Sequence, residues 1–238
     1  MEETDEFLAM AKDRELQAAV DDSPPPFDAS AETLSVLRDH WPAGLLCTAG
    51  VAAMAANYYL LGAYLRDWMI TECRIDPLVA SLSMIMGQAM GAAITPLAGW
   101  SADYFGVGRT NLAHAAASSV LALPVYRLFH SLRSPILVVG TSVVYIGLAT
   151  GMSSSVFLWS VELFPVHVRG AGLNFYYNIG EGIGGLGPVV CSWLGNPFGP
   201  AYYTVVCSAM ASVALATTVW MKQNGGPLQV THVRDEPY

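Results

Sequence analysis

Four polar residues near position 180 have the types and the spacing to handle a proton or a small polar ligand. They occur at i, i+3, i+4 and i+7, so a helix presents all of them on one face. The four residues are Asn174, Tyr177, Asn178 and Glu181. Glu181 is the only charged residue between positions 170 and 194. If this stretch crosses a membrane, the carboxylate costs roughly 2.5 to 3.5 kcal/mol at the helix centre and needs a partner, a water-filled path or a proton.

Two interpretations of Glu181 follow from this cost. In the first, Glu181 takes up a proton that is coupled to transport, and the polar stripe lines the path of the substrate. In the second, Glu181 is a structural partner for a buried donor or lies nearer the membrane surface. The stretch is also rich in glycine and ends in Gly187-Pro188, which predicts a helix that bends or breaks. Broken helices mark substrate sites in several transporter folds.

Other polar residues in apolar stretches are weaker candidates for the same path. Asn57 and Gln88 each lie within an uncharged stretch of more than twenty residues. Tyr58 and Tyr59 either bind a quaternary ammonium group by cation–π contact or pack against lipid. Two pairs of glycines spaced by four, beginning at Gly87 and Gly147, predict close helix packing.

The elements that position these residues are predicted to be membrane-spanning helices. The chain of 238 residues is 53% hydrophobic and 13% charged, against about 25% charged in ordinary soluble domains. A helix needs roughly 20 apolar residues to cross the hydrocarbon core. Six stretches meet this requirement or approach it, which predicts an all-α polytopic membrane protein. The predicted spans are 43–65, 77–102, 111–126, 134–161, 171–194 and 201–221.

Charge divides the chain into two parts. Residues 1–39 hold 11 acidic and 3 basic residues, which accounts for the whole net charge of −8. We therefore expect an acidic cytoplasmic tail over 1–42, a neutral bundle over 43–222 and a cytoplasmic tail over 223–238. An even number of spans places both ends on one side of the membrane. Four basic residues near the membrane on each side leave the orientation undecided by charge, and three in the tails favour cytoplasmic ends.

Several functional classes find no support in the sequence. The excess of acidic over basic residues disfavours a nucleic-acid partner. The 4 cysteines and 5 histidines show no metal-ligand spacing. No catalytic constellation or cofactor motif is visible, so we expect neither an enzyme nor a metal or cofactor protein.

Two loops between predicted spans carry regularly placed charges. The first contains Asp103 and Arg109, with Gly106 and Gly108 between them to allow a tight turn. Asp103 is placed to accept hydrogen bonds from the first turn of the next helix. The second loop contains Glu162 and Arg169 on either side of Pro165. Charges in such loops, at the membrane–water interface, cost little free energy and can pair across neighbouring helices.

These loops resemble transport proteins of the major facilitator superfamily. Gly99, Asp103, Gly106 and Arg109 match its repeated loop motif, although Tyr104, Val107 and Gly108 replace its other basic positions. The second loop resembles the metabolite:proton symporter family, which includes proline/betaine, 2-oxoglutarate, shikimate and citrate carriers. Its matching segments are Glu162-Leu-Phe-Pro165, Arg169-Gly-Ala-Gly172, Tyr177-Asn178-Ile-Gly180 and Gly184-Gly-Leu-Gly187-Pro188.

The resemblance covers essentially the whole chain and implies the C-terminal six-helix half of a twelve-helix carrier. It implies proton-coupled symport of a small polar metabolite by alternating access, in the cell membrane. Asp103, Arg109, Glu162 and Arg169 would form a cytoplasmic charge latch. The partner would be a separate N-terminal half or a second copy of the chain. The alternative is a non-transporting membrane interaction protein or a vestigial half-transporter.

Overall fold

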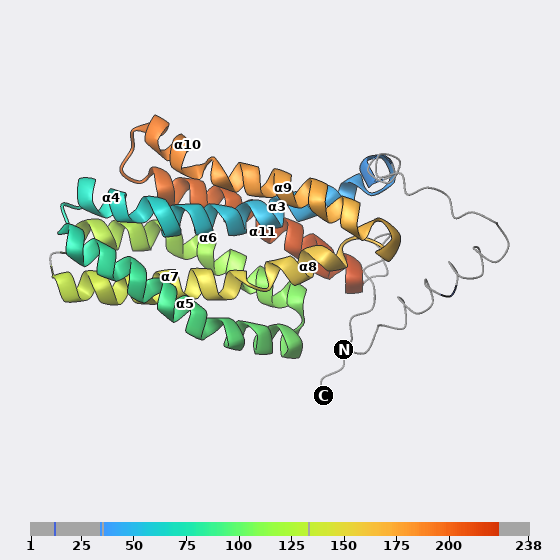
Figure 1. Cartoon of the computed structure of the whole chain (residues 1–238), viewed down its shortest axis with the longest axis horizontal. Helices are drawn as coiled ribbons and strands as arrows, with labels where there is room; N and C mark the ends of the chain where they lie inside the picture. Colours follow the sequence, from blue (N-terminus) through green and yellow to red (C-terminus); the bar gives the residue numbers. More distant parts are fainter. Residues whose placement is uncertain (1–11, 13–33, 35, 133, 224–238) are drawn as a thin grey trace.

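The computed structural model describes residues 12, 34, 36–132 and 134–223, and every element in these ranges is helical (Figure 1). The expected tails, 1–42 and 223–238, therefore lie mostly outside the described residues. The elements are α3 (Trp41–Tyr59), the π-helical η1 (Leu60–Tyr64), α4 (Leu65–Thr71), α5 (Pro77–Phe105), α6 (Val107–Ser131), α7 (Pro135–Ser153), α8 (Val156–Glu162), the 3₁₀ turn η2 (Val166–Val168), α9 (Arg169–Gly185), α10 (Gly187–Leu194) and α11 (Gly199–Gln223).

Five of the helical segments in the described part are long and apolar enough to cross a membrane. They are Trp41–Thr71, Pro77–Phe105, Val107–Ser131, Pro135–Glu162 and Gly199–Met221. The described part of the chain is therefore an all-helical bundle, and its long apolar helices are compatible with an integral membrane protein. Each segment passes the predicted range at one end or at both. The extensions are longest at Trp41–Thr71 and Val107–Ser131, where charged residues such as Arg66 and Arg109 continue the helix.

The remaining predicted span, 171–194, is divided at Leu186 into α9 with 17 residues and α10 with 8. Neither part alone has the roughly 20 residues that a span needs. The Leu186 amide still donates to the carbonyls of Gly182 and Ile183, at 3.1 and 3.3 Å. Pro188 at the start of α10 cannot donate and so favours the break. The predicted break in this helix is confirmed.

Close contacts between small residues hold α5 against α7. A methyl group on Gly151 would lie 2.9 Å from the carbonyl oxygen of Gly91, and one on Gly87 would lie 2.7 Å from Cβ of Ile146. Such distances leave no room for a side chain, so the two backbones approach each other directly. The packing role predicted for the two glycine pairs is confirmed.

A second close contact joins α3 to α9. A methyl group on Gly180 would lie 2.9 Å from the carbonyl oxygen of Thr48, and one on Gly184 would lie 2.8 Å from that of Ala52. Only part of the glycine-rich sequence therefore serves the helix break. Gly180 and Gly184 allow helix contact instead, while Gly182 faces open space.

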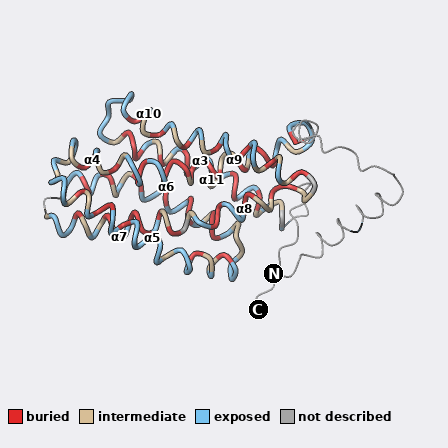
Figure 2. The backbone as a smooth tube through the Cα atoms, in the orientation of Figure 1, coloured by how far each residue is buried: buried red, intermediate tan, exposed pale blue. Residues whose placement is uncertain are grey.

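The outer surface of the bundle matches a lipid environment. Figure 2 shows buried residues along the inner sides of the helices and exposed ones outside. Tyr202 and Trp220 are both exposed on α11, and their separation of 18 positions corresponds to about 27 Å of helix. This length is close to the roughly 30 Å of a hydrocarbon core, and Trp and Tyr favour the two membrane–water interfaces.

Trp159 connects three helices of the bundle. Its ring fills the space opposite Gly50 of α3, where a methyl group would lie 2.8 Å from ring atom Cη2. Its indole nitrogen is 3.4 Å from the Thr218 hydroxyl of α11. The side chain therefore joins α8 to α3 and α11 at one level.

Candidate functional site

Glu181 lies within the length of the bundle rather than at one of its ends, as the packing of α9 on α3 shows. The preceding residue, Gly180, contacts α3 at Thr48 and Val51. Val51 is ten residues from the start of α3 at Trp41, or about 15 Å along the helix axis. The apolar segment that begins at Trp41 has 31 residues and continues to Thr71. Glu181 therefore lies beside the first half of this segment, where a charge in a membrane-spanning bundle is costly.

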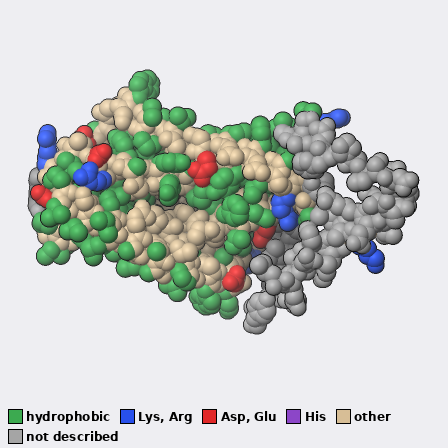
Figure 3. Space-filling view, in the orientation of Figure 1, with side chains coloured by type: hydrophobic (Ala, Val, Ile, Leu, Met, Phe, Trp, Pro, Cys, Tyr) green, Lys and Arg blue, Asp and Glu red, His purple; other side chains and the backbone are tan. Residues whose placement is uncertain are grey.

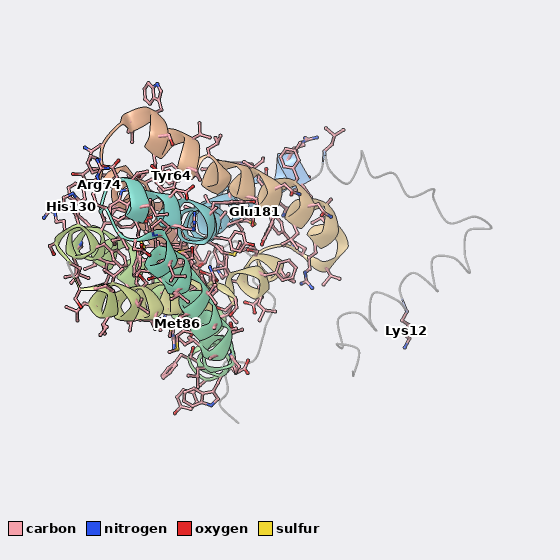
Figure 4. All side chains as sticks on the ribbon, turned by 60° about the vertical axis from the view of Figure 1, so that its left-hand side comes forward. Lys12, Tyr64, Arg74, Met86, His130 and Glu181 are labelled. Carbon is pink, nitrogen blue, oxygen red and sulfur yellow. The ribbon has the colours of Figure 1, made fainter. Side chains whose placement is uncertain are left out.

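The other charges of the described residues gather toward the two ends of the bundle. Figure 3 shows blue and red side chains at both ends and an acidic patch midway between them. In Figure 4, Arg74 and His130 mark one end, and Glu181 lies well away from them on the side of α9. The Glu181 side chain is half-buried. The carboxylate is therefore held away from the end marked by Arg74 and His130 and remains partly accessible from the surface.

The four stripe residues lie together on α9, as predicted. Tyr177 forms a side-chain hydrogen bond with Glu181. Asn174 donates its amide to the carbonyl of Gly170 at 2.9 Å, and Asn178 donates to the carbonyl of Asn174. Both asparagine side chains are exposed. Because their amide groups are bound to backbone, their carbonyl oxygens are the groups left for a ligand.

Aromatic rings surround this stripe. The rings of Phe157 from α8 and Tyr177 meet edge to face, with centroids 5.9 Å apart. Tyr59 from α3 lies beside the end of α9, where a methyl group on Gly185 would be 3.4 Å from its ring. Tyr58 and Tyr59 also meet edge to face, 5.4 Å apart. The surface around the carboxylate thus combines oxygen acceptors with aromatic faces, a combination suited to a cation or a proton.

The two weaker path candidates are placed differently from each other. Gln88 is exposed on α5, and its amide nitrogen is 3.9 Å from the position of a methyl group on Gly62 in η1. Asn57 is only 3% exposed, and its amide donates to the carbonyl of Ala53 at 3.1 Å. Gln88 is thus available on the surface, whereas Asn57 points into the bundle.

The four latch residues occupy two corners at the end of the bundle where α3 begins. Asp103 ends α5 and Arg109 begins α6, and both are exposed. Glu162 ends α8, and Arg169 begins α9 and donates to the carbonyl of Phe164 at 3.2 Å. Whether they act as a latch stays a prediction. The N-cap of α6 is Gly106, which has no side chain to accept a hydrogen bond, and the hydrogen bonds expected for Asp103 are not found among the described residues.

The turn between α5 and α6 depends on one glycine rather than two. Gly106 has a φ of 89°, a conformation that side chains rarely adopt, and it supports the predicted tight turn. Gly108 lies instead within α6, and a methyl group there would be 3.3 Å from a methyl carbon of Val219. Its role is therefore packing against α11.

Sequence reasoning missed a buried polar pair that supports the interruption between α7 and α8. Asn111 of α6 donates to the backbone carbonyl of Ser155 at 3.2 Å, and the Ser155 hydroxyl donates back at 2.8 Å. Both residues are at most 2% exposed. The signal was present in the sequence, because a single asparagine in an apolar span needs a partner.

The described residues contain no group of three or more His, Cys, Asp or Glu that could hold a metal ion. Comparison of the chain with protein-family models, with curated proteins and with solved structures finds no match in any of the three.

Proposed function

We propose that this chain is one six-span bundle of a secondary transporter, resembling the C-terminal half of a metabolite:proton symporter of the major facilitator superfamily. The observation that carries the proposal is the Glu181 carboxylate between the two ends of the bundle, partly exposed, while the other charges lie toward those ends. A charge within a membrane-spanning helix is costly and marks a functional site by default. In this proposal α9 and α10 together form the fifth of six spans, and α11 is the sixth.

The chemistry of the stripe supports proton coupling. Glu181 alternates between a protonated and an ionised state, and the Tyr177 hydroxyl one helical turn earlier can donate a hydrogen bond to its carboxylate. The exposed carbonyl oxygens of Asn174 and Asn178 accept hydrogen bonds from the substrate. An acceptor-rich surface bordered by aromatic rings favours a cationic or zwitterionic metabolite over a polyanion.

Alternating access requires a second bundle that covers the Glu181 face. The partner is a separate N-terminal half or a second copy of this chain. Asp103, Arg109, Glu162 and Arg169 lie at one end of the bundle, where they would pair with the partner when that end closes. The start of α3 and the end of α11 both lie on this side of the bundle (Figure 1). We assign this side to the cytoplasm and the protein to the cell membrane.

The test of the function is substrate-driven proton movement. Membranes containing the chain are fused into liposomes with an entrapped pH indicator, and proline, betaine, 2-oxoglutarate, shikimate or citrate is added outside. We expect at least one of the zwitterions, proline or betaine, to acidify the interior. Acidification by none of the five, with or without a co-expressed partner bundle, would favour a non-transporting membrane interaction protein.

Pairing with a second copy makes a separate prediction. Cross-linking in native membranes should yield a species of twice the monomer mass. Phe157→Asn should lower the yield of this cross-linked dimer several-fold, because Phe157 is 49% exposed beside Tyr177 on the face that the second copy would cover. Val213→Asn on α11 is the matched control, since Val213 is 69% exposed on a different helix. Monomers alone in membranes and in detergent would exclude the homodimer.

A further inference from the structure

Five side-chain oxygens in the described part of the chain are buried without a hydrogen-bond partner. They are Asn57 Oδ1, Tyr126 Oη, Tyr145 Oη, Thr204 Oγ1 and Ser208 Oγ. Other buried hydroxyls of the bundle do not share this feature. Those of Ser83, Ser142 and Ser160 each donate to the carbonyl four residues earlier, at 2.8 to 2.9 Å. The five oxygens thus form a distinct set.

Helix packing places Asn57 of α3 at the same height in the bundle as the hydroxyls of Thr204 and Ser208 in α11. At one level, Trp159 joins Gly50 of α3 to Thr218 of α11. Closer to the other end, the position of a methyl group on Gly187 is 3.3 Å from Leu60 and 3.0 Å from Tyr203. The two helices therefore run antiparallel between these levels, and Asn57 falls within the range that contains Ser208.

The two tyrosines extend the set past η1. The rings of Tyr126 and Tyr145 are 6.4 Å apart, and Trp68 of α4 packs on Tyr126 at 5.0 Å. All five oxygens therefore lie between the levels of Asn57 and Trp68. This interval contains the π-helical turn Leu60–Tyr64, and π-helical turns are frequent at functional sites.

We propose that these oxygens bind a cluster of internal water molecules between α3–α4, α6, α7 and α11. Buried water typically makes two to four hydrogen bonds to polar groups that would otherwise lack partners. The five oxygens are neutral, so a cation among them would have no compensating charge. The nearby buried polar groups of α6, His114 and Ser118, contact each other at 3.4 Å and add no carboxylate. Water is therefore the ligand that fits.

Removal of single hydroxyls tests the proposal by the sign of the change in stability. Thr204→Val and Tyr126→Phe each remove one oxygen at nearly constant shape. If the oxygens are hydrated, each change loses a hydrogen bond and lowers Tm by about 2–4 °C in a chain of this size. If they are dry, each change removes an unsatisfied group and raises Tm. Thr217→Val is the control, because Thr217 is exposed and its hydroxyl donates only to the Val213 carbonyl of its own helix. Its loss leaves no buried group without a partner and should leave Tm nearly unchanged.

Hydroxyl-radical footprinting gives an independent readout on the unmodified protein. Water bound beside Tyr126 and Tyr145 should cause their oxidation although they are 0% and 7% exposed. Phe129 is also 0% exposed and packs on Tyr126, so it should stay unlabelled. A rise in Tm for both variants, or unlabelled Tyr126 and Tyr145, would overturn the proposal.

Discussion

Replacement of Glu181 by glutamine should abolish substrate-driven proton movement and leave the bundle folded. Glutamine keeps the size of the side chain and its ability to accept from Tyr177, but it cannot take up or release a proton. The initial rate of internal acidification in liposomes should fall to that of protein-free vesicles. Counterflow of labelled substrate, which needs no net proton transfer, should persist.

Two measurements separate a role in coupling from a structural role. The thermal stability of Glu181→Gln should equal or exceed that of the parent protein, since the change removes a charge within a membrane-spanning helix. A structural partner would instead lose stability on substitution. Glu72→Gln is the control, because Glu72 is exposed beyond the end of α4 and its loss should leave proton movement intact. Unchanged acidification in Glu181→Gln would remove Glu181 from the mechanism.

Gly184→Ala should give the largest loss of stability among conservative changes on α9. The added methyl group would lie 2.5 Å from the backbone nitrogen of Ala56 and 2.8 Å from the carbonyl oxygen of Ala52. Backbone atoms cannot move aside as a flexible side chain can, so α3 and α9 must separate. Overpacking of this kind costs about 1–3 kcal/mol, which unfolding in mixed detergent would measure.

Gly182→Ala is the matched control two residues away. No atom of the described structure lies within 4 Å of a methyl group at this position, so the change adds helix propensity without a clash. It should stabilise the bundle by up to about 1 kcal/mol. Equal effects of the two substitutions would show that α9 does not pack on α3 at Gly184.

Much of the fold follows from local properties of the sequence. The apolar stretches predicted the helices, because their length and low charge are properties of each segment alone. The spacing of Gly87 with Gly91 and of Gly147 with Gly151 predicted close packing. It did not show that the two pairs meet each other, because this contact joins helices separated by the whole of α6.

The glycine-rich stretch of α9 shows where such inference ends. The sequence alone predicted a helix that breaks, and the break at Leu186 agrees. It could not separate Gly180 and Gly184, which contact α3, from Gly182, which contacts nothing within 4 Å. That distinction depends on which side of α9 faces the neighbouring helix.

The sequence by itself determined that Glu181 shares a helix face with Asn174, Tyr177 and Asn178 in an apolar stretch, because helix periodicity is local. Only the tertiary structure decided its position along the bundle, since this follows from the packing of Gly180 against Thr48 and Val51. It also separated exposed Gln88 from buried Asn57. Both are amides in apolar helices, and they differ only in the neighbours that the bundle places against them.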